Sequence, residues 1–124
     1  PPGLAQAFFR MKVAGVHPVL AHPERYRPFF ESTDAMDPLL DVGALPLLDV
    51  MALAGKYGKA PQRAAERMLD EGVYYAACSD AHRPADTLIV AEGIALLEKR
   101  VGREEKDFLL HHGPRDILAG TIED

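Results

Sequence analysis

The chain has 124 residues, the size of one ordinary domain. With 48% hydrophobic and 27% charged residues its composition is that of a folded globular protein, and no apolar run reaches the roughly 18 residues that a membrane span needs. Because 14 Lys and Arg face 19 Asp and Glu, the net charge is −5, and we expect no general electrostatic binding to nucleic acid.

The first third of the chain predicts a helix, a strand and a loop. Apolar residues recur at helical spacing over Leu4–Ala14, and Gly15 follows as a stop signal. The apolar run Val16–Ala21 predicts a buried strand that ends at His22. The stretch Pro23–Thr33 contains two prolines and several charged residues, so it predicts a loop with at most a helical turn.

The rest of the chain alternates between helices and strands. The expected elements, in order, are a short helix from Asp34 or Asp37 to Val42, a strand over Leu45–Val50, a helix over Pro61–Leu69, a strand over Val73–Cys78, a long helix over Asp86–Lys99, and two helices over Glu104–Leu110 and Pro114–Leu118. Such alternation is typical of an α/β fold in which parallel strands are joined by helical crossovers. We therefore predict a parallel sheet with flanking helices.

Chemically active side chains follow the predicted strands. His22 follows the first strand, Asp49 lies near the end of the second, and Asp80 and His82 follow the third. Ligands of parallel α/β folds gather beyond the carboxyl ends of the strands, so three strand ends are expected to converge on one site.

The run Asp80-Ala81-His82 places a carboxylate and an imidazole two residues apart. This spacing lets both side chains reach one cation or two neighbouring cations, and His22 is a candidate for a further nitrogen ligand. A mixed set of His and carboxylate ligands suits Mn²⁺, Fe²⁺ or Zn²⁺. The alternative is an Asp that caps the next helix beside an exposed His.

The run His22-Pro23-Glu24-Arg25-Tyr26 gathers a His, a carboxylate, a guanidinium and a phenol directly after a strand. Arg25 is the natural candidate for binding an anion, because its planar guanidinium matches phosphate oxygens in pairs. The alternative is an ordinary surface pair of Arg and Glu beside a packed Tyr.

Two other motifs are weaker. Only four residues separate Cys78 from Arg83, one too few for a cysteine-dependent phosphatase loop, so we expect Cys78 to be a small buried strand residue. A single cysteine also makes a reducing, cytoplasmic compartment the default. Lys56 and Lys59 lie in a glycine-rich loop that lacks phosphate-loop spacing, and each is either solvent-exposed or a contributor to substrate binding.

Three segments together resemble one family. They are Val19–Tyr26 (VLAHPERY), Leu53–Lys59 (LAGKYGK) and Cys78–His82 (CSDAH), and the closing Gly113–Gly120 is also similar to that family's final helix. The chain resembles the C-terminal half of the polymerase-and-histidinol-phosphatase (PHP) superfamily, specifically the bacterial tyrosine phosphatases of capsule and exopolysaccharide synthesis.

The resemblance implies a distorted (β/α)7 barrel with a divalent metal cluster at its C-terminal mouth, for which we expect Mn²⁺, with Fe²⁺ or Zn²⁺ as alternatives. It implies that His22, Asp80 and His82 are metal ligands and that Arg25 holds the substrate phosphate. It also implies a phosphotyrosine protein as substrate, namely a bacterial tyrosine kinase that governs polysaccharide assembly.

The chain departs from the family pattern in several places. The family's N-terminal His-x-His motif, a further His and a bridging Glu are not in this sequence, and the start at Pro1-Pro2 without Met is typical of a sequence entered partway. Thr87 stands where the family has a second phosphate-binding Arg, for which Arg83 is a candidate substitute. The family usually has Asn where Asp49 lies, so the role of Asp49 is left open.

Because of these departures, we expect an incomplete metal site. Residues 1–124 are expected to be a partial PHP domain with weak metal affinity and little phosphatase activity on its own. Exposed strand edges would then favour self-association. Two alternatives stay open, namely a PHP phosphoesterase for a small phosphorylated metabolite and a non-catalytic assembly module that keeps remnants of the ligand set.

Overall fold

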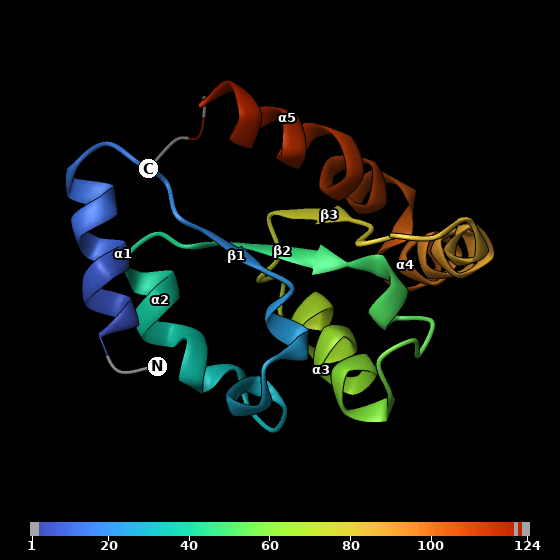
Figure 1. Ribbon diagram of the computed structural model, residues 1–124. Coiled ribbons are helices and arrows are strands. Elements are labelled where there is room, and N and C mark those ends of the chain that lie inside the picture. The colour runs from blue at the N-terminus through green and yellow to red at the C-terminus, as the bar shows by residue number, and fades with distance from the viewer. Residues whose placement is uncertain (1–2, 121, 123–124) are drawn as a thin grey trace.

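The computed structural model describes residues 3–120 and residue 122 (Figure 1). Three strands, β1 (Val19–Ala21), β2 (Leu45–Asp49) and β3 (Ala76–Cys78), form a parallel sheet in the order β1-β2-β3. The predicted parallel α/β arrangement is confirmed, whereas its assignment to part of a PHP barrel stays a prediction.

The strands are flanked by helices whose apolar faces supply the core. The helices are α1 (Leu4–Val13), α2 (Asp37–Asp41), α3 (Lys59–Asp70), α4 (Thr87–Asp107) and α5 (Gly113–Ala119). Figure 1 shows α3 and α5 on opposite sides of the strands. Leu48 of β2, Met68 of α3 and Leu97 of α4 are all fully buried, so the sheet and two of its helices share one core.

The expected boundaries need several corrections. The first and third strands begin at Val19 and Ala76, three residues later than predicted, because hydrogen-bonded pairing covers only the last part of each apolar run. The loop after His22 contains three short 3₁₀ turns instead of one helical turn. The long helix α4 extends to Asp107 with a break at Gly102, whose φ is 90°. A π-helical turn over Phe108–His112 then joins it to α5.

Two glycines allow helices to approach the strands closely. A Cβ atom at Gly93 of α4 would collide with the carbonyl oxygen of Val50, and one at Gly113 of α5 would collide with that of Tyr75. Because only glycine lacks Cβ, these two positions bring α4 and α5 against the backbone of the sheet region. The residues at the strand ends are therefore carried on a closely packed frame.

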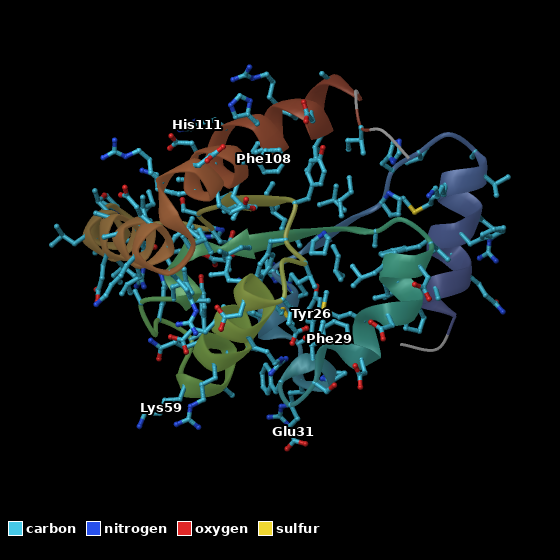
Figure 2. The ribbon with its side chains drawn as sticks, turned by 180° about the vertical axis from the view of Figure 1, so that it is seen from behind. Tyr26, Phe29, Glu31, Lys59, Phe108 and His111 are labelled. Carbon is cyan, nitrogen blue, oxygen red and sulfur yellow. The ribbon has the colours of Figure 1, made fainter. Side chains whose placement is uncertain are left out.

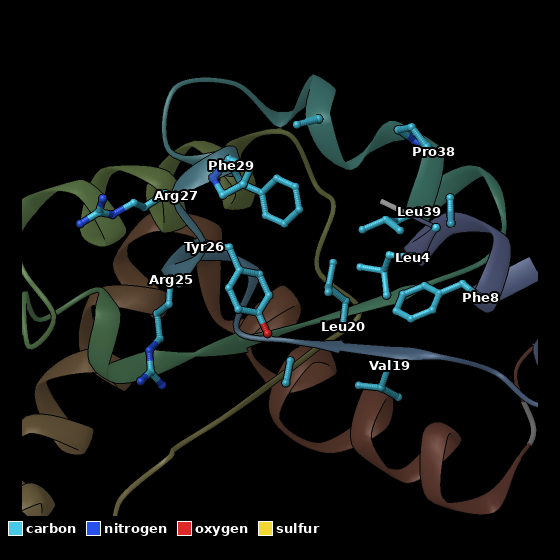
Figure 3. A pocket seen from close by; sticks show the side chains of 15 residues that line it. Leu4, Phe8, Val19, Leu20, Arg25, Tyr26, Arg27, Phe29, Pro38 and Leu39 are labelled. Atoms are coloured by element: carbon cyan, nitrogen blue, oxygen red, sulfur yellow. The ribbon is translucent and has the colours of Figure 1, made fainter. Parts of the chain in front are cut away.

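An apolar hollow of about 820 Å³ lies beside β1 (Figure 3). The ring of Tyr26 points into it among Leu20, Phe29 and Phe8, whereas the guanidinium of Arg25 points away from these apolar side chains. Self-association through such a surface stays a prediction. No helix in the described part of the chain is long and apolar enough to cross a membrane.

Candidate phosphate and metal site

Arg25 connects the carboxyl ends of all three strands. It lies in a 3₁₀ turn (Pro23–Arg25) directly after β1. Its Nη1 donates to Asp80 Oδ2 at 3.1 Å and lies 3.7 Å from Asp49 Oδ2. Asp49 ends β2 and Asp80 follows β3, so the predicted convergence of three strand ends is observed.

The guanidinium of Arg25 is also stacked on an aromatic ring. Its Cζ lies 4.1 Å from the ring centroid of Tyr57, which is the geometry of a cation–π contact. Tyr57 in turn donates its hydroxyl to Asp49 Oδ2 at 2.5 Å. Burial and the neighbouring Asp49 carboxylate raise the pKa of Tyr57, so its hydroxyl stays protonated and fixes the ring. Arg25 is therefore held between a ring and two carboxylates while 29% of its side chain remains exposed.

Glu24 anchors the turn that carries Arg25. Its side chain is completely buried, and its carboxyl oxygens accept hydrogen bonds from Tyr74 Oη at 2.7 Å and from the backbone N–H of Asp49 at 3.2 Å. Burial raises the pKa of Glu24 to about 7, mainly because the carboxylate loses hydration there. The sequence did not predict a role for Glu24, because its partner Tyr74 lies 50 residues away and no local sequence pattern indicates the contact.

His22 occupies a constrained position at the end of β1. Its backbone has φ 38° and ψ 60°, and it is the only described residue other than glycine with positive φ. Its backbone N–H donates to Leu47 O, and its Nδ1 atom is buried without a hydrogen-bond partner. Such strain and an unpaired imidazole nitrogen are typical of a ligand-binding position.

The loop after β3 is more open. The His82 side chain is 76% exposed; its Nδ1 lies 2.6 Å from the carbonyl oxygen of Asp80, and its Nε2 lies 3.8 Å from Asp80 Oδ1. Arg83 is exposed at the start of the following 3₁₀ turn. The backbone N–H of His82 donates to the buried carboxylate of Asp86, which closes this loop onto the start of α4.

The side chains of His22, Asp80 and His82 are of the types that bind divalent cations, because imidazole nitrogen and carboxylate oxygen bind Mn²⁺, Fe²⁺ and Zn²⁺. The unpaired His22 Nδ1 is the observation that most favours a ligand role. Within the described ranges, however, no three His, Cys, Asp or Glu side chains gather closely enough to hold an ion. The described residues therefore offer candidate ligands without forming a full coordination shell.

The expectation for Cys78 is wrong in one respect. The residue is exposed, as the last residue of β3, whereas the two residues before it are buried. Partial desolvation and the nearby Asp49 raise the pKa of its thiol to about 11, so the thiol is protonated near neutral pH. A protonated thiol is a poor nucleophile, which agrees with the exclusion of a cysteine-dependent mechanism.

The chain matches one protein family over nearly its whole length. The profile described as Capsular polysaccharide synthesis, CpsB/CapC, covers residues 3–119. The chain belongs to the CpsB/CapC family. This finding confirms the resemblance drawn from the HPERY and SDAH segments.

Individual relatives agree with this assignment. The chain is 31% identical over 100 residues to the tyrosine-protein phosphatase YwqE of Bacillus subtilis, a match that covers 80% of this chain and 39% of YwqE. It is 30% identical over 77 residues to CapC of Staphylococcus aureus, covering 62% and 30% of the two chains.

A solved structure shares the fold. It comes from a study of YwqE from Bacillus subtilis and CpsB from Streptococcus pneumoniae, described as metal-dependent tyrosine phosphatases. The TM-score is 0.84 at 28% identity, and the similarity covers 97% of this chain and 49% of the solved one. The chain therefore spans about half the length of this structural relative and a smaller share of the two curated relatives.

Proposed function

We propose that this chain supplies one part of the active site of a metal-dependent protein-tyrosine phosphatase. The contact between Arg25 and Asp80 at the strand ends carries the proposal, because it joins the candidate phosphate-binding cation to a candidate metal ligand. The name of YwqE and the description of its structure support the same reaction class.

In this proposal Arg25 binds the phosphate of the substrate. A guanidinium presents paired N–H donors that match two phosphate oxygens. In the described arrangement the carboxylate of Asp80 accepts from Arg25. We infer that substrate phosphate takes over this donor, which frees Asp80 to coordinate a cation. The Tyr57 ring and Asp49 keep the guanidinium in place during this exchange of partners.

His22, Asp80 and His82 are the proposed metal ligands of this chain, with Mn²⁺ as the proposed ion and Fe²⁺ or Zn²⁺ as alternatives. A bound divalent ion supplies an activated water and stabilises charge on the phosphate. The remaining ligands are proposed to come from polypeptide outside residues 1–124, because the described residues do not complete a coordination shell. Residues 1–124 are thus proposed to be a partial PHP domain that has little activity alone.

The proposed substrate is a phosphotyrosine protein, specifically a bacterial tyrosine kinase of polysaccharide assembly. The test compares a phosphotyrosine peptide with histidinol phosphate, using the full-length natural protein loaded with Mn²⁺. Preferential, chelator-sensitive hydrolysis of the peptide is expected, whereas preference for histidinol phosphate would establish the small-metabolite alternative.

The ligand assignment has a separate test in the metal content of the same protein. We expect His82→Ala to lower bound Mn²⁺, measured by elemental analysis after gel filtration. Unchanged metal content would contradict the ligand role and favour a non-catalytic assembly module. Rapid, chelator-sensitive turnover of p-nitrophenyl phosphate by residues 1–124 alone would contradict the proposed need for further ligands.

A further inference from the structure

Lys56 is held next to the candidate site by a buried carboxylate. Its Nζ lies 2.7 Å from Asp86 Oδ1, and the side chain of Asp86 is only 3% exposed. The other oxygen of Asp86 accepts the backbone N–H of His82. Asp86 therefore ties the Lys56 ammonium to the loop that carries Asp80 and His82.

Lys56 and Arg25 share an aromatic neighbour. The Lys56 Nζ lies 6.0 Å from the ring centroid of Tyr57, and the Arg25 Cζ lies 4.1 Å from the same point. The two cationic groups are therefore at most about 10 Å apart, and the flexible lysine stem allows the ammonium to adjust to a ligand between them. Both remain accessible, with 20% of the Lys56 side chain and 29% of the Arg25 side chain exposed.

The two carboxylates beside Arg25 oppose the binding of a phosphate unless a second positive group lies nearby. Asp80 and Asp49 lie 3.1 and 3.7 Å from its guanidinium, so an arriving phosphate meets two carboxylates beside one positive group. Like charges at such distances oppose binding unless further positive charge offsets them. The Lys56 ammonium has three hydrogens; Asp86 takes one and Met51 Sδ, at 3.8 Å, takes a second, so one donor remains for a phosphate oxygen.

We propose that Lys56 is a second phosphate-binding residue, which together with Arg25 binds the phosphate of the substrate beside the Tyr57 ring. The proposal rests on the proposed phosphatase function and deepens it. Asp86 is then a positioning residue that holds the ammonium toward the strand ends. Arg83, the candidate drawn from the sequence, is exposed at the start of the following 3₁₀ turn.

The test uses the full-length natural protein loaded with Mn²⁺. Affinity for inorganic phosphate is measured by isothermal titration, and KM and kcat are measured with p-nitrophenyl phosphate. We expect Lys56→Met to weaken phosphate binding about 10- to 100-fold, as for loss of a charge-assisted hydrogen bond, and to raise KM more than it lowers kcat. Lys56→Arg is expected to restore most of the affinity.

Lys59→Met is the matched control, because Lys59 is an exposed lysine three residues further along. Figure 2 shows it at the outer edge of the molecule, at the start of α3. This variant removes the same charge and should change phosphate affinity less than about 2-fold. If Lys56→Met unfolds because Asp86 loses its partner, the double variant Lys56→Met/Asp86→Asn removes both charges and should show the same loss of phosphate affinity.

Separate outcomes identify which idea fails. Wild-type affinity in Lys56→Met, or an equal loss in Lys59→Met, would overturn the role of Lys56. A large loss in Arg83→Gln with none in Lys56→Met would assign the second cation to Arg83 instead. If Arg25→Met leaves phosphate binding unchanged and the wild-type protein hydrolyses no phosphotyrosine, the proposed function fails as well.

Discussion

The two segments that carry the candidate site are held in different ways. The turn His22–Arg25 is fixed from within, by the buried Glu24 and by its contacts with Tyr74 and the backbone of Asp49. The loop from Asp80 to Asp86 is attached at both ends: Asp80 accepts from the partly exposed Arg25, and Asp86 accepts from Lys56 and from the backbone of His82. The His82 side chain between them extends into solvent. We infer that Arg25, the proposed phosphate-binding residue, is positioned in advance, whereas the loop that carries the proposed metal ligands Asp80 and His82 gains its final order from further ligands.

Removal of the Glu24 carboxyl should have the largest effect on stability. Glu24→Ala leaves the buried Tyr74 hydroxyl and the Asp49 N–H without a partner and opens a cavity. We expect a loss of about 2–4 kcal/mol in the free energy of unfolding, measured with urea. Glu24→Gln should cost distinctly less, because its amide oxygen still accepts one of the two hydrogen bonds. A loss below about 1 kcal/mol in Glu24→Ala would show that the turn is held by other contacts.

The same carboxyl predicts a pH dependence. The pKa of Glu24 is about 7 in the folded chain and near 4.5 in the unfolded chain, so the folded state retains the proton between these values. The associated stability is fully present below about pH 4.5 and is lost as the pH rises through about 7. Urea unfolding of metal-free protein from pH 5 to 8 should show this decline, and Glu24→Gln should flatten it. An unchanged slope in Glu24→Gln would assign the decline to another group.

Substitution of Arg67 should have the next largest effect on stability, because Arg67 attaches the segment after Arg25 to α3. Its guanidinium donates to the carbonyl oxygens of Phe29 and Phe30 and to the hydroxyl of Thr33. Arg67→Met should lower the free energy of unfolding by about 1.5–3 kcal/mol. Arg63→Met, on an exposed face of the same helix, is the matched control and should change it by less than about 0.5 kcal/mol. Equal effects of both variants would rule out a specific role for Arg67.

The sequence predicted the positions of strands and helices better than the side-chain contacts between distant residues. Apolar runs and stop signals located β2 and α3 to within one or two residues, because periodicity and local breakers decide those elements. The meeting of the three strand ends, observed in the contacts of Arg25 with Asp49 and Asp80, followed from the parallel α/β pattern. Glu24 and Tyr74 could not be paired in this way, since a buried hydrogen bond between residues 50 positions apart leaves no periodic signal.

Substitution of His82 should have the smallest effect on the stability of metal-free protein. Its ring is largely exposed, and its Nδ1 contacts only the carbonyl oxygen of Asp80 among the hydrogen bonds described. We expect His82→Ala to change the free energy of unfolding by less than about 0.5 kcal/mol, which is typical of exposed positions. With Mn²⁺ bound to the full-length protein, the same substitution should remove part of the stabilisation that the ion provides, because binding to the folded state alone raises stability. An equal effect of His82→Ala with and without Mn²⁺ would mean that the His82 ring has no share in metal binding, and its exposure would then reflect packing alone.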